Sequence, residues 1–253
     1  MPQTIIVVPC YNEADRLDLP AFRSFADTQP DIRFLFVNDG STDLTQEVVE
    51  SLRAEDPAAF DVLSLERNQG KATAVRLGLL EALASSPSVV GYWDADLSTP
   101  LDEIPRFVGV LEAQPELIAV FGSRMRSLGR HIERRPARHY SGRLFATLAA
   151  MTLGLAVYDT QCGAKAFRAT VALGDLLQSP FRSRWIFDVE LIARLARHLA
   201  EDGKGGPEHR ILELPLNQWC DVAGSKIGPG DGLRAFVDLW RIRRAYPPPH
   251  PRG

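Results

Sequence analysis

The chain has few of the residues that hold together secreted or zinc-binding proteins. Of its 253 residues only three are cysteines, Cys10, Cys162 and Cys220, and they are far apart. An odd and widely spaced set argues against a disulfide framework or a zinc site, and it indicates a reducing compartment. The five histidines are also scattered, without metal-binding spacing.

Long apolar runs and targeting signals are missing as well. The longest apolar run, residues 144–157, has 14 residues, and about 18 are needed to suggest a membrane span. Met1 leads directly into a strand-like segment without the basic region of a cleavable signal. We therefore expect no transmembrane helix, and a cytoplasmic protein that is soluble or peripheral at the cytoplasmic membrane face.

Several function classes lack their signatures. A formal net charge of −3 gives no case for nucleic acid as a partner. The sequence contains no Gly-x-x-x-x-Gly-Lys-Ser/Thr loop, no dinucleotide-binding glycines after the first expected strand, and no Gly-x-Ser-x-Gly elbow. These absences exclude P-loop enzymes and argue against dinucleotide oxidoreductases and serine hydrolases.

What is present is a regular alternation of strand-like and helix-like segments. Strands are expected at 4–8, 32–37, 61–65, 89–93 and 117–122. Between them we expect helices from Asn12 toward Phe25, from 41–43 to Leu52, from Lys71 through Ala84, and over 101–113. The pattern predicts a single-domain α/β fold, a mostly parallel Rossmann-like sheet flanked by helices, with ligands at the carboxyl ends of the strands.

The second half is less regular. Residues 123–139 read as an arginine-rich loop, which fits either a solvated surface or an anion-binding segment. Residues 144–157 fit either simple core or a helix at a phospholipid surface. A helix is expected over 187–199, a strand over 211–214 and a last helix over 231–243. The predicted domain is 1–245, followed by a proline-rich, unstructured tail, 246–253.

The polar residues at the expected strand ends have a common chemistry. Asp94 and Asp96 follow a buried strand and could share one Mg²⁺ or Mn²⁺, although a solvated turn is the alternative. Glu13, Asp39 and Lys71 come from three other strand ends. Carboxylates suit ribose hydroxyls and base N–H groups, while lysine and a metal suit phosphates. The set therefore favours a nucleotide-diphosphate pocket.

Four segments together resemble family 2 glycosyltransferases of the GT-A fold. They are Val7 to Glu13 (VVPCYNE), Val37 to Asp43 (VNDGSTD), Asn68 to Lys71 (NQGK) and Asp94-Ala95-Asp96. The resemblance extends from residue 5 to about 244. Further residues are similar to polyprenyl-phosphate sugar synthases, both dolichyl-phosphate glucosyltransferases and dolichol-phosphate mannose synthases. They are 122–124, 142–143, 159–168, 187–191, and Trp219 with 224–226.

The resemblance implies roles for individual residues. Pro9, Tyr11, Glu13 and Asp39 would hold the base and ribose, with Lys71 near the nucleotide. Asp94 and Asp96 would bind nucleotide and metal. Arg124 would meet the donor diphosphate or the acceptor phosphate, and Arg138 with Ser141 would seat the acceptor. The predicted catalytic residues are Asp96 and Arg124, together with Asp188 as a candidate base.

Three departures from the family pattern bear on the donor. Ser98 stands where many mannosyl-type members have a metal-binding Gln, Asp221 stands near their phosphate-binding Arg, and Ala72 replaces a usual Gly. The first two weaken GDP-mannose as the donor and favour UDP-glucose. The resemblance thus implies an inverting transferase that moves glucose from UDP-glucose to a polyprenyl phosphate.

Two alternatives stay open. A transferase acting on a soluble hydroxyl acceptor would need a general base, for which Asp188 and Glu190 are candidates. The alternative is that they cap and charge a helix N-terminus, which is the favoured interpretation for Glu190 and stays open for Asp188. A nucleotide-sugar-binding protein without turnover is the other alternative, against which the full set Lys71, Asp94, Asp96 and Arg124 argues.

Overall fold

The computed structural model describes residues 3–133, 136–221 and 231–248, and at 133, 136–141 and 231–233 it describes the backbone alone. A seven-stranded sheet forms its centre, in the order β3-β2-β1-β4-β7-β5-β8. The strands are β1 (Thr4–Cys10), β2 (Ile32–Asn38), β3 (Phe60–Ser64), β4 (Val89–Trp93), β5 (Ala119–Ser123), β7 (Ala164–Arg168) and β8 (Ile211–Pro215).

The sheet is mostly parallel, as predicted. β1 pairs in parallel with β2 and β4, β2 with β3, and β5 with β8. β7 is antiparallel to both of its neighbours, β4 and β5. No pattern in the sequence predicted this inserted strand, because its partners lie far away along the chain.

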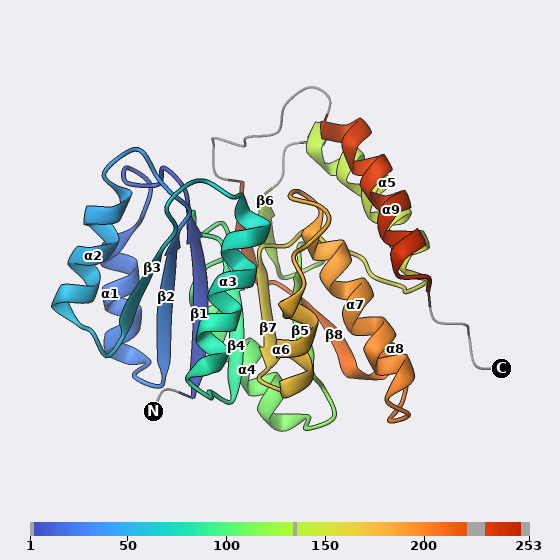
Figure 1. Cartoon of the computed structure of the whole chain (residues 1–253), viewed down its shortest axis with the longest axis horizontal. Coiled ribbons are helices and arrows are strands. Elements are labelled where there is room, and N and C mark those ends of the chain that lie inside the picture. Colours follow the sequence, from blue (N-terminus) through green and yellow to red (C-terminus); the bar gives the residue numbers. More distant parts are fainter. Residues whose placement is uncertain (1–2, 134–135, 222–230, 249–253) are drawn as a thin grey trace.

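Helices cover both faces of the sheet (Figure 1). Apolar side chains of α1 (Leu19–Thr28), α2 (Thr45–Glu55) and α4 (Glu103–Ala113) form one buried cluster with the sheet. Those of α3 (Lys71–Ala84), α6 (Val171–Gln178), α7 (Phe187–Glu201), α5 (Pro136–Leu153) and α9 (Asp231–Ala245) belong to the cluster on the other face. Adjacent residues of β4 divide between the two: Tyr92 belongs to the α7 side and Trp93 to the α4 side. This division accounts for the uninterrupted apolar run in β4, since both faces of a parallel sheet are buried.

Two expectations about local structure were wrong. The first helix begins at Leu19, not after Asn12, because Asp18 accepts the N–H of Ala21 at 3.0 Å and caps it there. Asn12 instead has a φ of 52° within a loop. The expected loop 123–139 contains a short strand, β6 (His131–Glu133), paired with β9 (Gln218–Cys220), and the start of α5.

Other features of the chain agree with the predictions or extend them. Gly40 has a φ of 61° and packs so closely on Arg67 that a Cβ would lie 2.4 Å from the Arg67 carbonyl carbon, so this turn requires glycine. The short helix α8 (Pro207–Arg210) leads into β8.

Tyr246 packs against the core just past the expected domain end, whereas 249–253 lie outside the described residues. Over the described part of the chain, no helix has the length and apolar character to cross a membrane.

Candidate active site

A cavity of about 940 Å³ lies at the carboxyl edge of β1, β2 and β4 and is closed on another side by α9. Seven of the predicted site residues line it: Pro9, Tyr11, Glu13, Asp39, Lys71, Asp94 and Asp96. The other lining residues are Cys10, Arg16, Asn68, Gly70, Ala74, Ala95, Arg182, Arg184, Trp185, Arg234, Ala235, Val237, Asp238 and Arg241. Segments more than 200 residues apart in sequence therefore meet in one cleft.

Asp39 fixes the loop that carries Lys71. Its Oδ1 accepts the backbone N–H of Gln69 and its Oδ2 that of Gly70, each at 2.7 Å. The carboxylate is almost completely buried, with 2% of the residue exposed. Gly70, with a φ of 93°, is the N-cap residue of α3, so that Lys71 is the first residue of the helix. Asp39 thus shapes the wall of the cavity through the backbone.

Lys71 forms an ion pair with Asp94 across the floor of the cavity. Burial lowers the pKa of Lys71, but the negative charges of Asp94 and Asp188 outweigh it. The net shift of the lysine pKa is upward, so Lys71 is a fixed cation at neutral pH. Asp94 is also pressed against the backbone of Gly163, where an added Cβ would lie 1.8 Å from Oδ2. The backbone N–H of Asp94 donates to the Gly163 carbonyl at 3.0 Å.

The second acid, Asp96, lies near an arginine that sequence reasoning missed. The Arg16 guanidinium lies 3.4 Å from the carboxylate of Glu13 and 3.7 Å from that of Asp96. It therefore connects the end of β1 with the end of β4. Asp96 Oδ1 accepts the N–H of Ser98 at 3.0 Å. No motif distinguishes Arg16 in the sequence; only the fold of the loop after β1 brings it to the acids.

The site fits a hard divalent cation that takes part of its ligands from substrate. Asp94 and Asp96 both open into the cavity, with side-chain exposures of 33% and 27%. Within the part of the chain that is described, no three acidic, histidine or cysteine side chains gather as a metal cage. Mg²⁺ and Mn²⁺ sites on enzymes that bind phosphates commonly use one or two carboxylates, with waters and phosphate oxygens as the remaining ligands.

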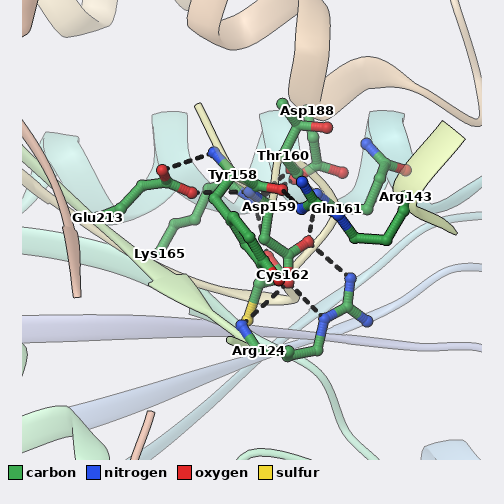
Figure 2. Close-up of polar contacts among 10 residues, drawn as sticks. All are labelled: Arg124, Arg143, Tyr158, Asp159, Thr160, Gln161, Cys162, Lys165, Asp188 and Glu213. Carbon is green, nitrogen blue, oxygen red and sulfur yellow. Dashed lines mark hydrogen bonds and ion pairs between the residues drawn. The ribbon is translucent and has the colours of Figure 1, made fainter. Parts of the chain in front are cut away.

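Arg124 does not line the cavity. Its Nε and Nη2 donate to the two carboxylate oxygens of Asp159 at 2.7 and 2.8 Å, a bidentate pair that Figure 2 shows. Its guanidinium also lies 5.3 Å from the centre of the Trp219 ring. The predicted contact of Arg124 with a phosphate therefore stays a prediction, and this conformation places the arginine in a structural ion pair beside the site.

Asp188 is buried behind the cavity rather than in its lining. It accepts hydrogen bonds from Lys165 Nζ at 2.6 Å and from the Tyr92 hydroxyl. Lys165, which is completely buried, also donates to the carbonyls of Thr160 and Cys162 at 3.0 and 2.7 Å. Asp188 stands in the first turn of α7, as the sequence suggested. Its role as a base stays untested, and its contacts indicate that it supports the turn 159–163.

Both ends of the turn 159–163 are held by charged side chains (Figure 2). Glu213 accepts the backbone N–H groups of Tyr158 and Asp159 at 2.6 and 2.7 Å. At the opposite end, Lys165 donates to the carbonyl of Cys162. The backbone of Gly163, the last residue of the turn, lies against the carboxylate of Asp94. At the predicted acceptor residues Arg138 and Ser141 only the backbone is described, not the side chains. The segment 224–226 lies outside the described residues.

Comparisons with known proteins agree with this geometry. The family model "Glycosyl transferase family 2" matches residues 5–173. A dolichyl-phosphate beta-glucosyltransferase from Drosophila melanogaster is 31% identical over 94% of this chain and 76% of its own. One from Trichomonas vaginalis is 28% identical over 94% of this chain and 70% of its own.

The fold also matches a solved structure. Glucosyl-3-phosphoglycerate synthase from Mycobacterium tuberculosis, crystallised with Mn²⁺, UDP and glucosyl-3-phosphoglycerate, superposes with a TM-score of 0.64 at 21% identity. The match covers 99% of this chain and 82% of that one. It confirms the predicted GT-A fold. Because the family model matches well over half of the residues, and a relative above 30% identity aligns along nearly the whole chain, this protein belongs to glycosyl transferase family 2.

Proposed function

We propose that the protein transfers glucose from UDP-glucose to a polyprenyl phosphate with inversion at the anomeric carbon. The observation that carries the proposal is the meeting of Lys71, Asp94 and Asp96 in one cavity with Asp39 and Glu13. The similarity to dolichyl-phosphate beta-glucosyltransferases supports the choice of glucose and of a lipid-phosphate acceptor.

In this proposal the acidic side of the cavity binds the donor. Pro9, Tyr11 and Glu13 border the space for the nucleoside, and Lys71 provides a positive charge for the diphosphate. Asp94 and Asp96 would hold Mg²⁺ or Mn²⁺, which supplies further positive charge to the departing diphosphate. Ion pairing with Asp94 keeps Lys71 at the floor of the cavity before substrate enters.

The acceptor determines whether a base is needed. A phosphate oxygen is already anionic at neutral pH, so it can attack the anomeric carbon directly while the bond to UDP breaks and UDP leaves with that electron pair. The burial of Asp188 against Lys165 supports a reaction without a protein base. A hydroxyl acceptor would require a proton acceptor in the cavity.

We further propose that α5 and α9 rest on the surface of a membrane. The two helices pack side by side (Figure 1) and expose large apolar side chains, namely Leu144 and Met151 on α5 and Phe236 and Trp240 on α9. Arg241, Arg243 and Arg244 lie on the same stretch of α9. Aromatic residues next to arginines favour an anionic lipid interface. Vesicles containing anionic lipid should retain the protein, and F236S/W240S should abolish retention; equal retention would contradict this placement.

A transfer assay tests the proposed reaction. The protein is incubated with UDP-[¹⁴C]glucose, Mn²⁺ and a short polyprenyl phosphate, and label is measured in the organic and aqueous phases. We expect glucose in the organic phase together with UDP release. Label in a water-soluble glycoside would favour a hydroxyl acceptor, and donor binding without UDP release would favour a protein that only binds nucleotide sugars. GDP-mannose in parallel controls for the donor.

A further inference from the structure

One wall of the cavity is rich in arginine and faces the acidic donor side. Arg182, Arg184 and Trp185 come from the segment 179–186 that precedes α7, and Arg234 and Arg241 come from α9. No acidic side chain forms an ion pair with Arg182 or Arg184 within the described part of the chain, whereas Arg124 is held by Asp159. Two cationic side chains therefore face the cavity with their charge available to a ligand.

A buried ion pair fixes the backbone of this segment. Arg194 and Glu190 lie one turn apart on α7, with 4% and 0% of the residues exposed, and bond at 2.6 Å. The same guanidinium donates to the carbonyls of Leu176, Ser179 and Pro180, each at 2.8 Å. Because a buried guanidinium must keep its hydrogen-bond partners, these bonds fix the backbone conformation of the segment before α7.

The segment is tied at its centre as well. Glu190 Oε2 accepts the backbone N–H of Arg182 at 2.7 Å. Ser183 is buried; its Oγ accepts the N–H of Ile186 at 3.0 Å and donates to Asp238 of α9 at 2.7 Å. Residues of α7 and α9 therefore fix the backbone of the segment, while the side chains of Arg182, Arg184 and Trp185 remain exposed to the cavity.

Arg184 reaches the donor side of the cavity. A Cβ on Gly70 would lie 3.0 Å from Arg184 Nε, so the guanidinium packs against the N-cap residue of α3. Lys71 is the next residue along. Through Arg184 the arginine-rich wall consequently adjoins the site assigned to the donor diphosphate.

We propose that Arg182 and Arg184 bind the phosphate of the acceptor, and that Trp185 contacts the first apolar units of its chain. This inference rests on the proposed function. An anionic acceptor must approach a second anion, the donor diphosphate, and this approach is unfavourable unless cations lie between the two. Arginine binds phosphate oxygens in a bidentate manner, and the 46% exposure of Trp185 offers an apolar surface beside them.

Farnesyl phosphate, titrated calorimetrically into protein saturated with UDP and Mn²⁺, tests the inference without turnover. R182Q and R184Q should each weaken its binding about tenfold or more, the usual loss for a hydrogen bond to a charged group. Binding of UDP-glucose should change less than about twofold. The matched control is R197Q on the outer side of α7, where Arg197 pairs with the exposed Glu201 at 2.9 Å; it should bind both ligands like the wild type.

The possible outcomes separate the inference from the proposed function. If the wild type transfers glucose to polyprenyl phosphate but R182Q and R184Q bind farnesyl phosphate normally, the inference is wrong and the function stands. If both variants lose UDP-glucose binding to the same extent, the arginines serve the donor instead, which also overturns the inference. If the wild type transfers nothing to polyprenyl phosphate, the proposed function fails. W185L should weaken farnesyl phosphate more than inorganic phosphate; equal effects would contradict the role of Trp185.

Discussion

The backbone of Gly163 lies directly against the carboxylate of Asp94, and a Cβ at this position would come within 1.8 Å of Oδ2. The contact joins the turn 159–163, which Lys165 and Glu213 hold in place, to the acid that pairs with Lys71. The position of the Asp94 carboxylate thus depends on residues up to 119 positions away in sequence.

Replacing Gly163 by alanine should displace Asp94 and lower kcat/KM by roughly 100-fold or more, since small misplacements of catalytic groups have effects of this size. Transfer kinetics and a thermal melt check this, with the fold expected to persist. The control is Gly109→Ala in α4, where an added Cβ meets nothing within 4 Å; it should retain full activity. Wild-type activity in the Gly163 variant would contradict the coupling.

Asp39→Asn should loosen the loop before α3. Both oxygens of Asp39 accept backbone N–H groups, so the amide must turn its NH₂ toward one of these donors and leave it unpaired. We expect the free energy of unfolding to fall by about 1–3 kcal/mol, with weaker UDP binding. Urea unfolding and calorimetry measure both quantities. Asp61→Asn, at a partly exposed pair with Arg33, is the control; equal losses in the two variants would count against a special role of Asp39.

The buried pair of Lys165 and Asp188 should behave as a structural unit. Removal of one partner of such a pair leaves an uncompensated charge, so K165M and D188N should each lower the free energy of unfolding by roughly 3–5 kcal/mol. The double variant K165M/D188N should lose clearly less than the sum of the two. If D188N keeps wild-type stability and loses all activity, Asp188 is a catalytic group instead.

The three thiols should differ in reactivity. Burial raises the pKa of Cys162 to about 11, and it raises that of Cys10 as well, whereas Cys220 is exposed. At pH 8, iodoacetamide should alkylate Cys220 alone in the folded protein and all three thiols in urea, as measured by mass spectrometry. Labelling of Cys162 as fast as Cys220 would contradict its burial.

The same shift predicts a dependence of stability on pH. A folded-state pKa above the ordinary 9.0 means that the folded protein favours the protonated thiol of Cys162. This contribution is complete below pH 9 and is lost as the pH rises through about 11. Melting temperatures of C162A should therefore fall less steeply than those of the wild type between pH 9 and 11.

Local sequence patterns predicted the elements whose structure is determined locally. The apolar runs of β2 and β4 place Asp39 and Asp94 at the ends of two strands that lie on either side of β1, and the fold brings both residues to one cavity. The position of β7 could not be predicted, because pairing with β4 and β5 depends on contacts remote in sequence.

The roles of the arginines around the cavity could not be predicted either, because they also depend on contacts remote in sequence. Arg124 stands in a recognisable motif, but its partner Asp159 lies 35 residues away, so the motif did not reveal the ion pair. Arg16, Arg182 and Arg184 belong to no motif considered in the sequence and reach the cavity only through the tertiary fold. Charge alone does not identify such residues, since most arginines in a sequence are solvated.

A crystal structure with UDP-glucose and Mn²⁺, recorded at the manganese absorption edge, tests the central claim most directly. We expect one anomalous peak within bonding distance of the carboxylates of Asp94 or Asp96 and of the donor diphosphate, with Lys71 beside the phosphates. In D96A the peak should vanish while the chain keeps its fold. A nucleotide bound outside the cavity, or a diphosphate that contacts neither Lys71 nor the manganese, would contradict the account.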